Sequence, residues 1–155
     1  MNALNLFSQN VSEVTLSYRT KIKASDRLQV KCSKDAYDIF MGNWNQDSIG
    51  HIEEFKLLLM TRSNSVLGIL SVSRGGISGT VTDVRLIYQA AIKACASGII
   101  VCHNHPSGNL NPSESDTKIT RKIKEAGNIM DVQLLDHLII SPDNNYYSFA
   151  DNGLL

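Results

Sequence analysis

The sequence has few of the features that indicate a disulfide framework, a linker or a polyanionic partner. Its 155 residues include only three prolines and three cysteines, with 15 Lys+Arg balanced by 15 Asp+Glu. Because the charges balance, the chain as a whole has no net positive charge that would attract nucleic acid. The cysteines, Cys32, Cys95 and Cys102, form no C-x-x-C pair. We therefore expect reduced thiols, as in cytoplasmic proteins.

Long apolar segments are also lacking. No run approaches the roughly 20 apolar residues that a membrane span needs. The first ten residues lack the basic start and apolar stretch of a signal peptide, so we expect a cytoplasmic protein with no membrane partner. The apolar share of 43% is enough to fill the core of one ordinary domain.

The first fifty residues differ in character from the rest. Val14, Leu16 and Tyr18 alternate with polar residues, which predicts a half-buried strand. Ser33 can cap a short helix that follows. We interpret residues 1–50 as a strand and helix extension that packs on a main domain at residues 51–155.

The main domain shows a mixed order of strands and helices. Its patterns predict a hairpin of two core strands, then a helix, a strand that is apolar on both faces, a second helix and two further strands. Their expected ranges are 55–60, 66–72, 84–95, 99–103, 113–126, 132–140 and 146–149. Glycines at 98 and 127 are expected to end the two helices. This order indicates an α/β or α+β layer structure.

The residues that carry chemistry follow the apolar strand. A strand period of two places His103 and His105 on the same side, with Cα atoms about 6 to 7 Å apart. Asp116, in the first turn of the next helix, could supply a third ligand. Two histidines and one carboxylate leave a fourth position for water, as in catalytic zinc sites. Zinc would lower the pKa of that water from 15.7 toward about 7.

A simpler interpretation covers the same residues. Ser113 and Asp116 form an S-x-x-D helix start, in which capping alone would explain both side chains.

A different zinc chemistry, that of the deaminases, can be excluded directly. Zinc deaminases need H-x-E followed by P-C-x-x-C, whereas this chain has H-x-H and no paired cysteines.

The spacing His103-x-His105, seven residues, Ser113, two residues, Asp116 resembles the JAMM metalloprotease signature. The strings HNHPSG at 103–108 and LDHLII at 135–140 resemble RadC-like proteins, which have been named for DNA repair. The resemblance implies a JAB/MPN-type, cytidine-deaminase-like α/β fold with a curved mixed sheet flanked by helices. It also implies Zn²⁺ held by His103, His105, Asp116 and a water, with Ser113 hydrogen-bonding the oxyanion.

The resemblance further implies an upstream glutamate that acts first as general base and then as general acid. RadC-like sequences carry this acid as E-x-F, which selects Glu53 ahead of Phe55. Strand alternation directs Glu53 and Glu54 to opposite faces, so only one of them can face the metal. We favour Glu53 and keep Glu54 as the alternative.

The expected function is zinc-dependent hydrolysis of a peptide or isopeptide bond. The alternative is a DNA-repair-associated or non-catalytic metal-binding module. Full-length RadC proteins carry an upstream helix-hairpin-helix segment, and the first fifty residues here are too few and too strand-like for one. The neutral chain gives no support for DNA as a partner. The substrate and the oligomeric state stay open.

Three further features have expected roles outside the ligand set. Cys102 should face away from the ion as a buried packing thiol. Asp136 and His137 could lie behind the metal ligands or form a structural pair. A basic helix face next to the site is expected to meet solvent rather than a phosphate backbone; its residues are Lys118, Arg121, Lys122 and Lys124.

Overall fold

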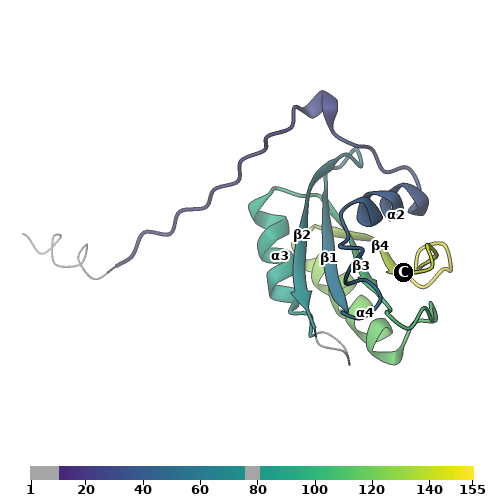
Figure 1. Cartoon of the computed structure of the whole chain (residues 1–155). Helices are drawn as coiled ribbons and strands as arrows, with labels where there is room; N and C mark the ends of the chain where they lie inside the picture. The colour runs from purple at the N-terminus through teal and green to yellow at the C-terminus, as the bar shows by residue number, and fades with distance from the viewer. Residues whose placement is uncertain (1–10, 76–80) are drawn as a thin grey trace, which may run out of the picture.

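The computed structural model describes residues 11–75 and 81–155, and its centre is one five-stranded sheet (Figure 1). The strands are β1 (Glu54–Met60), β2 (Val66–Arg74), β3 (Gly98–Asn104), β4 (Gln133–Ile140) and β5 (Tyr146–Ser148). They lie in the order β2-β1-β3-β4-β5. Only β3 and β4 run parallel, and the other neighbours are antiparallel. This mixed sheet confirms the predicted α/β fold class.

Helices cover both faces of the sheet. A short 3-10 turn, η1 (Ala24–Asp26), precedes α2 (Ser33–Gly42), which packs on one face. The other face carries α3 (Val84–Lys93) and α4 (Glu114–Met130) (Figure 1). No helix within the described ranges is long and apolar enough to cross a membrane.

The two core clusters explain why the central strands are apolar throughout. Every residue of β1 and of β3 is buried, since each strand contributes side chains to both faces. Leu57 packs toward α3 and α4, whereas its neighbour Leu58 packs toward α2. Cys102 belongs to the α2 cluster, so the prediction that this thiol faces away from His103 is confirmed.

The predicted end of the second long helix is wrong. Helix α4 continues through Gly127 to Met130, and Asp131 adopts the left-handed conformation at its C-cap with φ 53°. Gly127 has a packing role instead. A Cβ there would lie 2.4 Å from the carbonyl oxygen of Val132 and 2.7 Å from the hydroxyl of Tyr88. The absence of a side chain lets α4 approach these groups.

Two other expected helix boundaries also differ. Helix α3 ends at Lys93, where Ala94 is the C-cap, and Cys95 is exposed in a left-handed conformation with φ 54°. Gly98 is therefore the first residue of β3 rather than a helix cap. At α2 the N-cap is Cys32, one residue before the predicted Ser33.

The predicted half-buried strand near Val14 is also wrong. No strand is assigned over residues 11–23, and Val14 and Leu16 are 82% and 74% exposed. This part of the chain points away from the folded body (Figure 1). The Tyr18 hydroxyl donates a hydrogen bond to the Leu67 carbonyl at 2.9 Å. A strand pattern needs a pairing partner, and the described part of the chain does not pair with this segment.

The close approach at Gly127 predicts a measurable packing effect. We expect Gly127→Ala to lower the free energy of unfolding by about 1–3 kcal/mol, because the added methyl group meets backbone. Gly42→Ala is the matched control, since a Cβ there has no atom within 4 Å. Its stability should be unchanged or raised by up to about 1 kcal/mol. Urea denaturation of both variants measures the difference, and equal effects would contradict this role for Gly127.

Candidate metal centre

Two histidines meet where β3 leaves the sheet. His103 is the sixth residue of β3, and its side chain is buried on the face that α3 and α4 cover. His105 follows the strand, and its backbone N–H donates to the Ile140 carbonyl at 2.9 Å. This bond keeps the chain beside β4 for one more residue. The two Nε2 atoms lie 3.0 Å apart.

Asp116 faces both imidazoles from the first turn of α4. Its Oδ1 lies 3.1 Å from His103 Nε2, and its Oδ2 lies 3.4 Å from His105 Nε2. The three side chains each offer one ligand atom within 4.8 Å of the others. The structure therefore brings together the three residues that the sequence nominated as ligands.

The capping interpretation is confirmed. The Ser113 N–H donates to Asp116 Oδ2 at 2.7 Å, and the Asp116 N–H donates to Ser113 Oγ at 3.1 Å. These reciprocal bonds form a capping box at the start of α4. They also fix the carboxylate in the orientation that faces the histidines. Capping and ligand placement are two consequences of one geometry.

The donor set fits a zinc-like ion. The His105 Nδ1–H donates to the Asn109 carbonyl at 2.5 Å, which leaves the Nε2 lone pair free. Lone pairs of Nε2 and carboxylate atoms then face one another and repel unless a proton or a cation lies between them. Tetrahedral coordination at about 2.0–2.1 Å separates ligand atoms by roughly 3.3 Å. The observed separations of 3.0, 3.1 and 3.4 Å are close to that value.

The charges in the site are strongly coupled. Burial alone would raise the pKa of Asp116, but its close contacts with the His103 and His105 imidazoles hold it well below its ordinary value. The same contact with Asp116 raises the pKa of His105, which burial opposes. The carboxyl group is therefore ionised, the form in which it can bind a cation.

The two neighbouring glutamates have different surroundings. Glu54 is buried on the α2 side, where its carboxylate lies 3.6 Å from Lys56 Nζ and 3.3 Å from Arg74 Nε. The Ser48 hydroxyl also donates to it, at 3.4 Å. Glu53, in contrast, lines the hollow that contains His103. Because the Glu54 carboxylate is engaged in these contacts, Glu53 is the candidate for the general acid and base.

Asn104, between the two histidines, holds the chain around Glu53. Its Nδ2 donates to the carbonyls of Ile49 and Ile52 at 2.7 and 2.8 Å, and its Oδ1 accepts from the Glu54 N–H at 2.7 Å. The H-x-H spacing drew attention to the histidines, so sequence reasoning missed the residue between them. Its place at a buried strand exit, on the opposite face, is the signal that could have identified it.

The candidate centre lies in an open hollow of about 560 Å³. Ser113 is exposed at its edge, where its Oγ accepts the capping bond from Asp116. Among the described residues, its hydroxyl hydrogen has no acceptor. The hollow is also lined by apolar and polar side chains, those of Phe55, Val81, Thr82 and Ile119. A small group that enters can therefore reach Glu53, Ser113 and the ligand atoms together.

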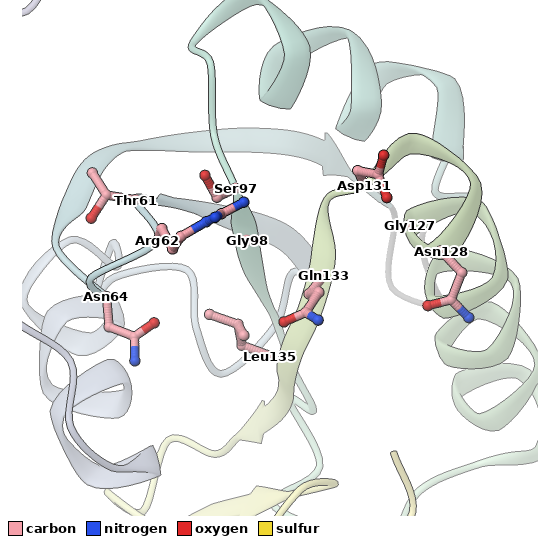
Figure 2. Close-up of a pocket in the computed structure, with 10 residues that line it drawn as sticks. All are labelled: Thr61, Arg62, Asn64, Ser97, Gly98, Gly127, Asn128, Asp131, Gln133 and Leu135. Atoms are coloured by element: carbon pink, nitrogen blue, oxygen red, sulfur yellow. The ribbon is translucent and has the colours of Figure 1, made fainter.

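A second hollow, of about 590 Å³, opens at the opposite end of the sheet, where β3 and β4 begin and α4 ends (Figure 2). Among its lining residues, the Arg62 side chain points toward Ser97 and Gly98, and Asp131 lies at the end of α4 (Figure 2). Its ten lining residues include neither histidine nor cysteine. Among the described residues, the group of three side chains that could hold a metal ion is at the β3 exit.

The pair Asp136–His137 separates into two roles. His137 lies on the face of β4 toward the site, and its Nε2 is 2.8 Å from His103 Nδ1. Asp136 accepts from the Ser148 hydroxyl and the Ala150 N–H at 2.7 and 3.0 Å. Burial raises the pKa of Asp136. Asp136 ties β4 to the C-terminal turn, and His137 lies behind the ligand His103.

Comparison with known proteins now gives the family. Residues 30–154 match the family described as RadC-like JAB domain. The chain belongs to this family. The match covers α2, the whole sheet and both helices of the other face, so the mixed sheet is that of a JAB domain.

Three relatives are similar over most of the chain, and all three are named UPF0758 protein. That of Flavobacterium johnsoniae is 48% identical over 137 residues, which are 85% of this chain and 57% of the relative. That of Porphyromonas gingivalis is 47% identical over 66% of this chain and 45% of the relative. That of Clostridium beijerinckii is 36% identical over 94% of this chain and 62% of the relative. The chain thus spans about half to three-fifths of the length of these relatives.

The different surroundings of the two glutamates predict different effects on stability. We expect Glu54→Gln to lower the free energy of unfolding by about 1–3 kcal/mol, because Lys56 loses its buried carboxylate partner. Glu53→Gln, the matched control, should change it by less than about 0.5 kcal/mol, since Glu53 lies in an open hollow. Thermal and urea unfolding check both values. A larger loss in Glu53→Gln would show that we have exchanged the two roles.

Proposed function

We propose that this domain is a metal-dependent hydrolase of the JAMM type that cleaves an amide bond, in a peptide or an isopeptide. The observation that carries the proposal is the meeting of His103, His105 and Asp116 with Glu53 and Ser113 around one hollow. The first three could hold an ion, and the other two lie where a bound substrate would react. RadC-like JAB membership supports the proposal.

We infer zinc as the ion. Two neutral imidazoles and one carboxylate with an open position form the ligand set of catalytic zinc sites. When bound, zinc supplies Lewis acidity and lowers the pKa of water toward about 7. Softer copper or iron–sulfur centres use thiolate ligands, and Cys102 faces the opposite side of the sheet.

Glu53 is the proton-transfer group in this proposal. Continuing the β1–β3 register, in which Phe55 pairs with His103, places Glu53 across from His105. Its carboxylate would accept a proton from the attacking water and return it to the leaving nitrogen. The Gly75 N–H donates to the Glu53 carbonyl at 2.8 Å, so the backbone at this position is held by the neighbouring strand.

Ser113 would stabilise the negative charge that forms on the carbonyl oxygen during attack. Its Oγ already accepts a hydrogen bond from the Asp116 N–H, which fixes the oxygen and leaves the hydroxyl hydrogen to donate. A preorganised donor of this kind typically contributes 10²–10³ in rate.

The first test is metal content. We expect about one zinc per chain in protein purified without chelator or affinity metal, and none in the His103→Ala, His105→Ala double variant. His51→Ala is the matched control, because His51 is exposed in the turn before β1. Elemental mass spectrometry measures the ratio, and circular dichroism checks that each variant is folded. Failure of the parent chain to take up supplied zinc would contradict the proposed centre.

The second test separates binding from catalysis. We expect Glu53→Gln to keep its zinc but to cleave peptides 10² to 10⁴ times more slowly, because proton transfer is lost. A mixed peptide library analysed by mass spectrometry identifies the bonds that the zinc-loaded parent cleaves. Ser113→Ala should retain zinc and lose about 10²–10³ in rate. Cleavage at the parental rate by Glu53→Gln would contradict the assignment of Glu53.

A further inference from the structure

The ligand His103 has a second, buried contact behind it. Its Nδ1 lies 2.8 Å from His137 Nε2, and His137 Nδ1 lies 2.6 Å from Thr120 Oγ1. Thr120 Oγ1 in turn lies 2.5 Å from the backbone carbonyl oxygen of Asp116. These contacts run from one proposed ligand, through β4 and α4, to the backbone of another. His103, His137 and Thr120 are 1%, 0% and 3% exposed.

The backbone carbonyl of Asp116 fixes the direction of every hydrogen bond in this series. A carbonyl can only accept, so the hydroxyl proton of Thr120 lies on that side. Thr120 Oγ1 must then accept from His137, which places a proton on His137 Nδ1. A neutral His137 therefore has a lone pair on Nε2, and His103 Nδ1–H donates to it. The remaining nitrogen of His103, Nε2, has its lone pair toward His105 and Asp116.

The surroundings of His137 favour its neutral form. Its ring stacks on Phe149, with centroids 4.8 Å apart and an interplanar angle of 9°, and Phe55 lies against it at 5.6 Å. The residue has no exposed surface, and burial disfavours the charged form of an imidazole. The neutral His137 ring can therefore accept one hydrogen bond and donate another.

We propose that Thr120 and His137 are positioning residues that fix His103 as the tautomer with Nε2 free to bind the metal. We call this series the Thr120–His137 relay, and its role in metal binding rests on the proposed function. A partner behind a histidine ligand sets both its tautomer and its ring orientation. Such partners are usually carboxylates, carbonyls or water. Here a second histidine, oriented by a threonine, takes their place.

Zinc affinity is the first measurement. We expect Thr120→Val to bind zinc 10- to 100-fold more weakly than the parent chain, because His137 loses the acceptor that sets its tautomer. Thr120→Ser, which keeps the hydroxyl, should restore affinity to within about threefold. Tyr88→Phe is the matched control, since the Tyr88 hydroxyl donates to the α4 carbonyl of Ile123 at 2.6 Å without contacting the relay. Competition against a zinc-chelating dye gives the dissociation constants.

The tautomers are the second measurement, and they need no metal. Long-range ¹H–¹⁵N correlation spectra of the apo chain distinguish protonated from unprotonated ring nitrogens. We expect His137 to be protonated on Nδ1 only and His103 to carry its proton on Nδ1. The Thr120→Val spectrum should lose this pattern, and the Thr120→Ser spectrum should keep it. Unfolding curves of the same variants show whether an affinity loss follows from global destabilisation.

The outcomes separate the two proposals. Parental zinc affinity in Thr120→Val, or a His137 protonated on Nε2, would overturn the relay and leave the metal centre standing. An affinity loss in Tyr88→Phe equal to that in Thr120→Val would also overturn it, because destabilisation alone would then explain the effect. A parent chain that binds no zinc would refute the metal centre, while the apo spectrum would still decide the tautomers.

Discussion

The capping box at the start of α4 is the constraint on which the candidate centre depends. One carboxylate, that of Asp116, accepts from the Ser113 N–H and faces His103 and His105. A helix turns by about 100° per residue, so a start one residue earlier or later would direct this carboxylate away from β3. The capping hydrogen bonds between Ser113 and Asp116 therefore also set the distance from the Asp116 carboxylate to the two imidazoles.

The sheet supplies the other half of this geometry. Strands β1 and β3 are antiparallel neighbours inside the sheet, so the start of β1 and the end of β3 lie at the same end of the sheet. Helix α4 packs on that sheet through Ile123, and at Gly127 it closely approaches Tyr88 of α3 and Val132. Buried packing therefore fixes the walls of the hollow that β1, β3 and α4 supply. A site on such elements keeps its geometry better than a site on loops.

Sequence reasoning recovered most of the elements and the site residues that carry strong local patterns. The hairpin, the buried strand β3 and the start of α4 were predicted because apolar runs, turn residues and the S-x-x-D start are local signals. The end of α4 was not, because Gly127 reads locally as a helix stop, while its contacts come from Val132 and Tyr88. The strand expected near Val14 was wrong for a related reason, since a strand exists only with a partner.

The sequence by itself determined the candidate residues and their spacing: two histidines on one side of a strand, an acid one turn into the next helix, and two adjacent glutamates on opposite faces. These follow from the periods of strands and helices, which are local properties of the backbone. Only the tertiary structure decided that Arg74 pairs with Glu54, that Asn104 holds the chain at Glu53, and that His137 and Thr120 lie behind His103. These contacts join residues 17 to 50 positions apart or on different strands, and no local period specifies which distant side chains will meet across a packed core.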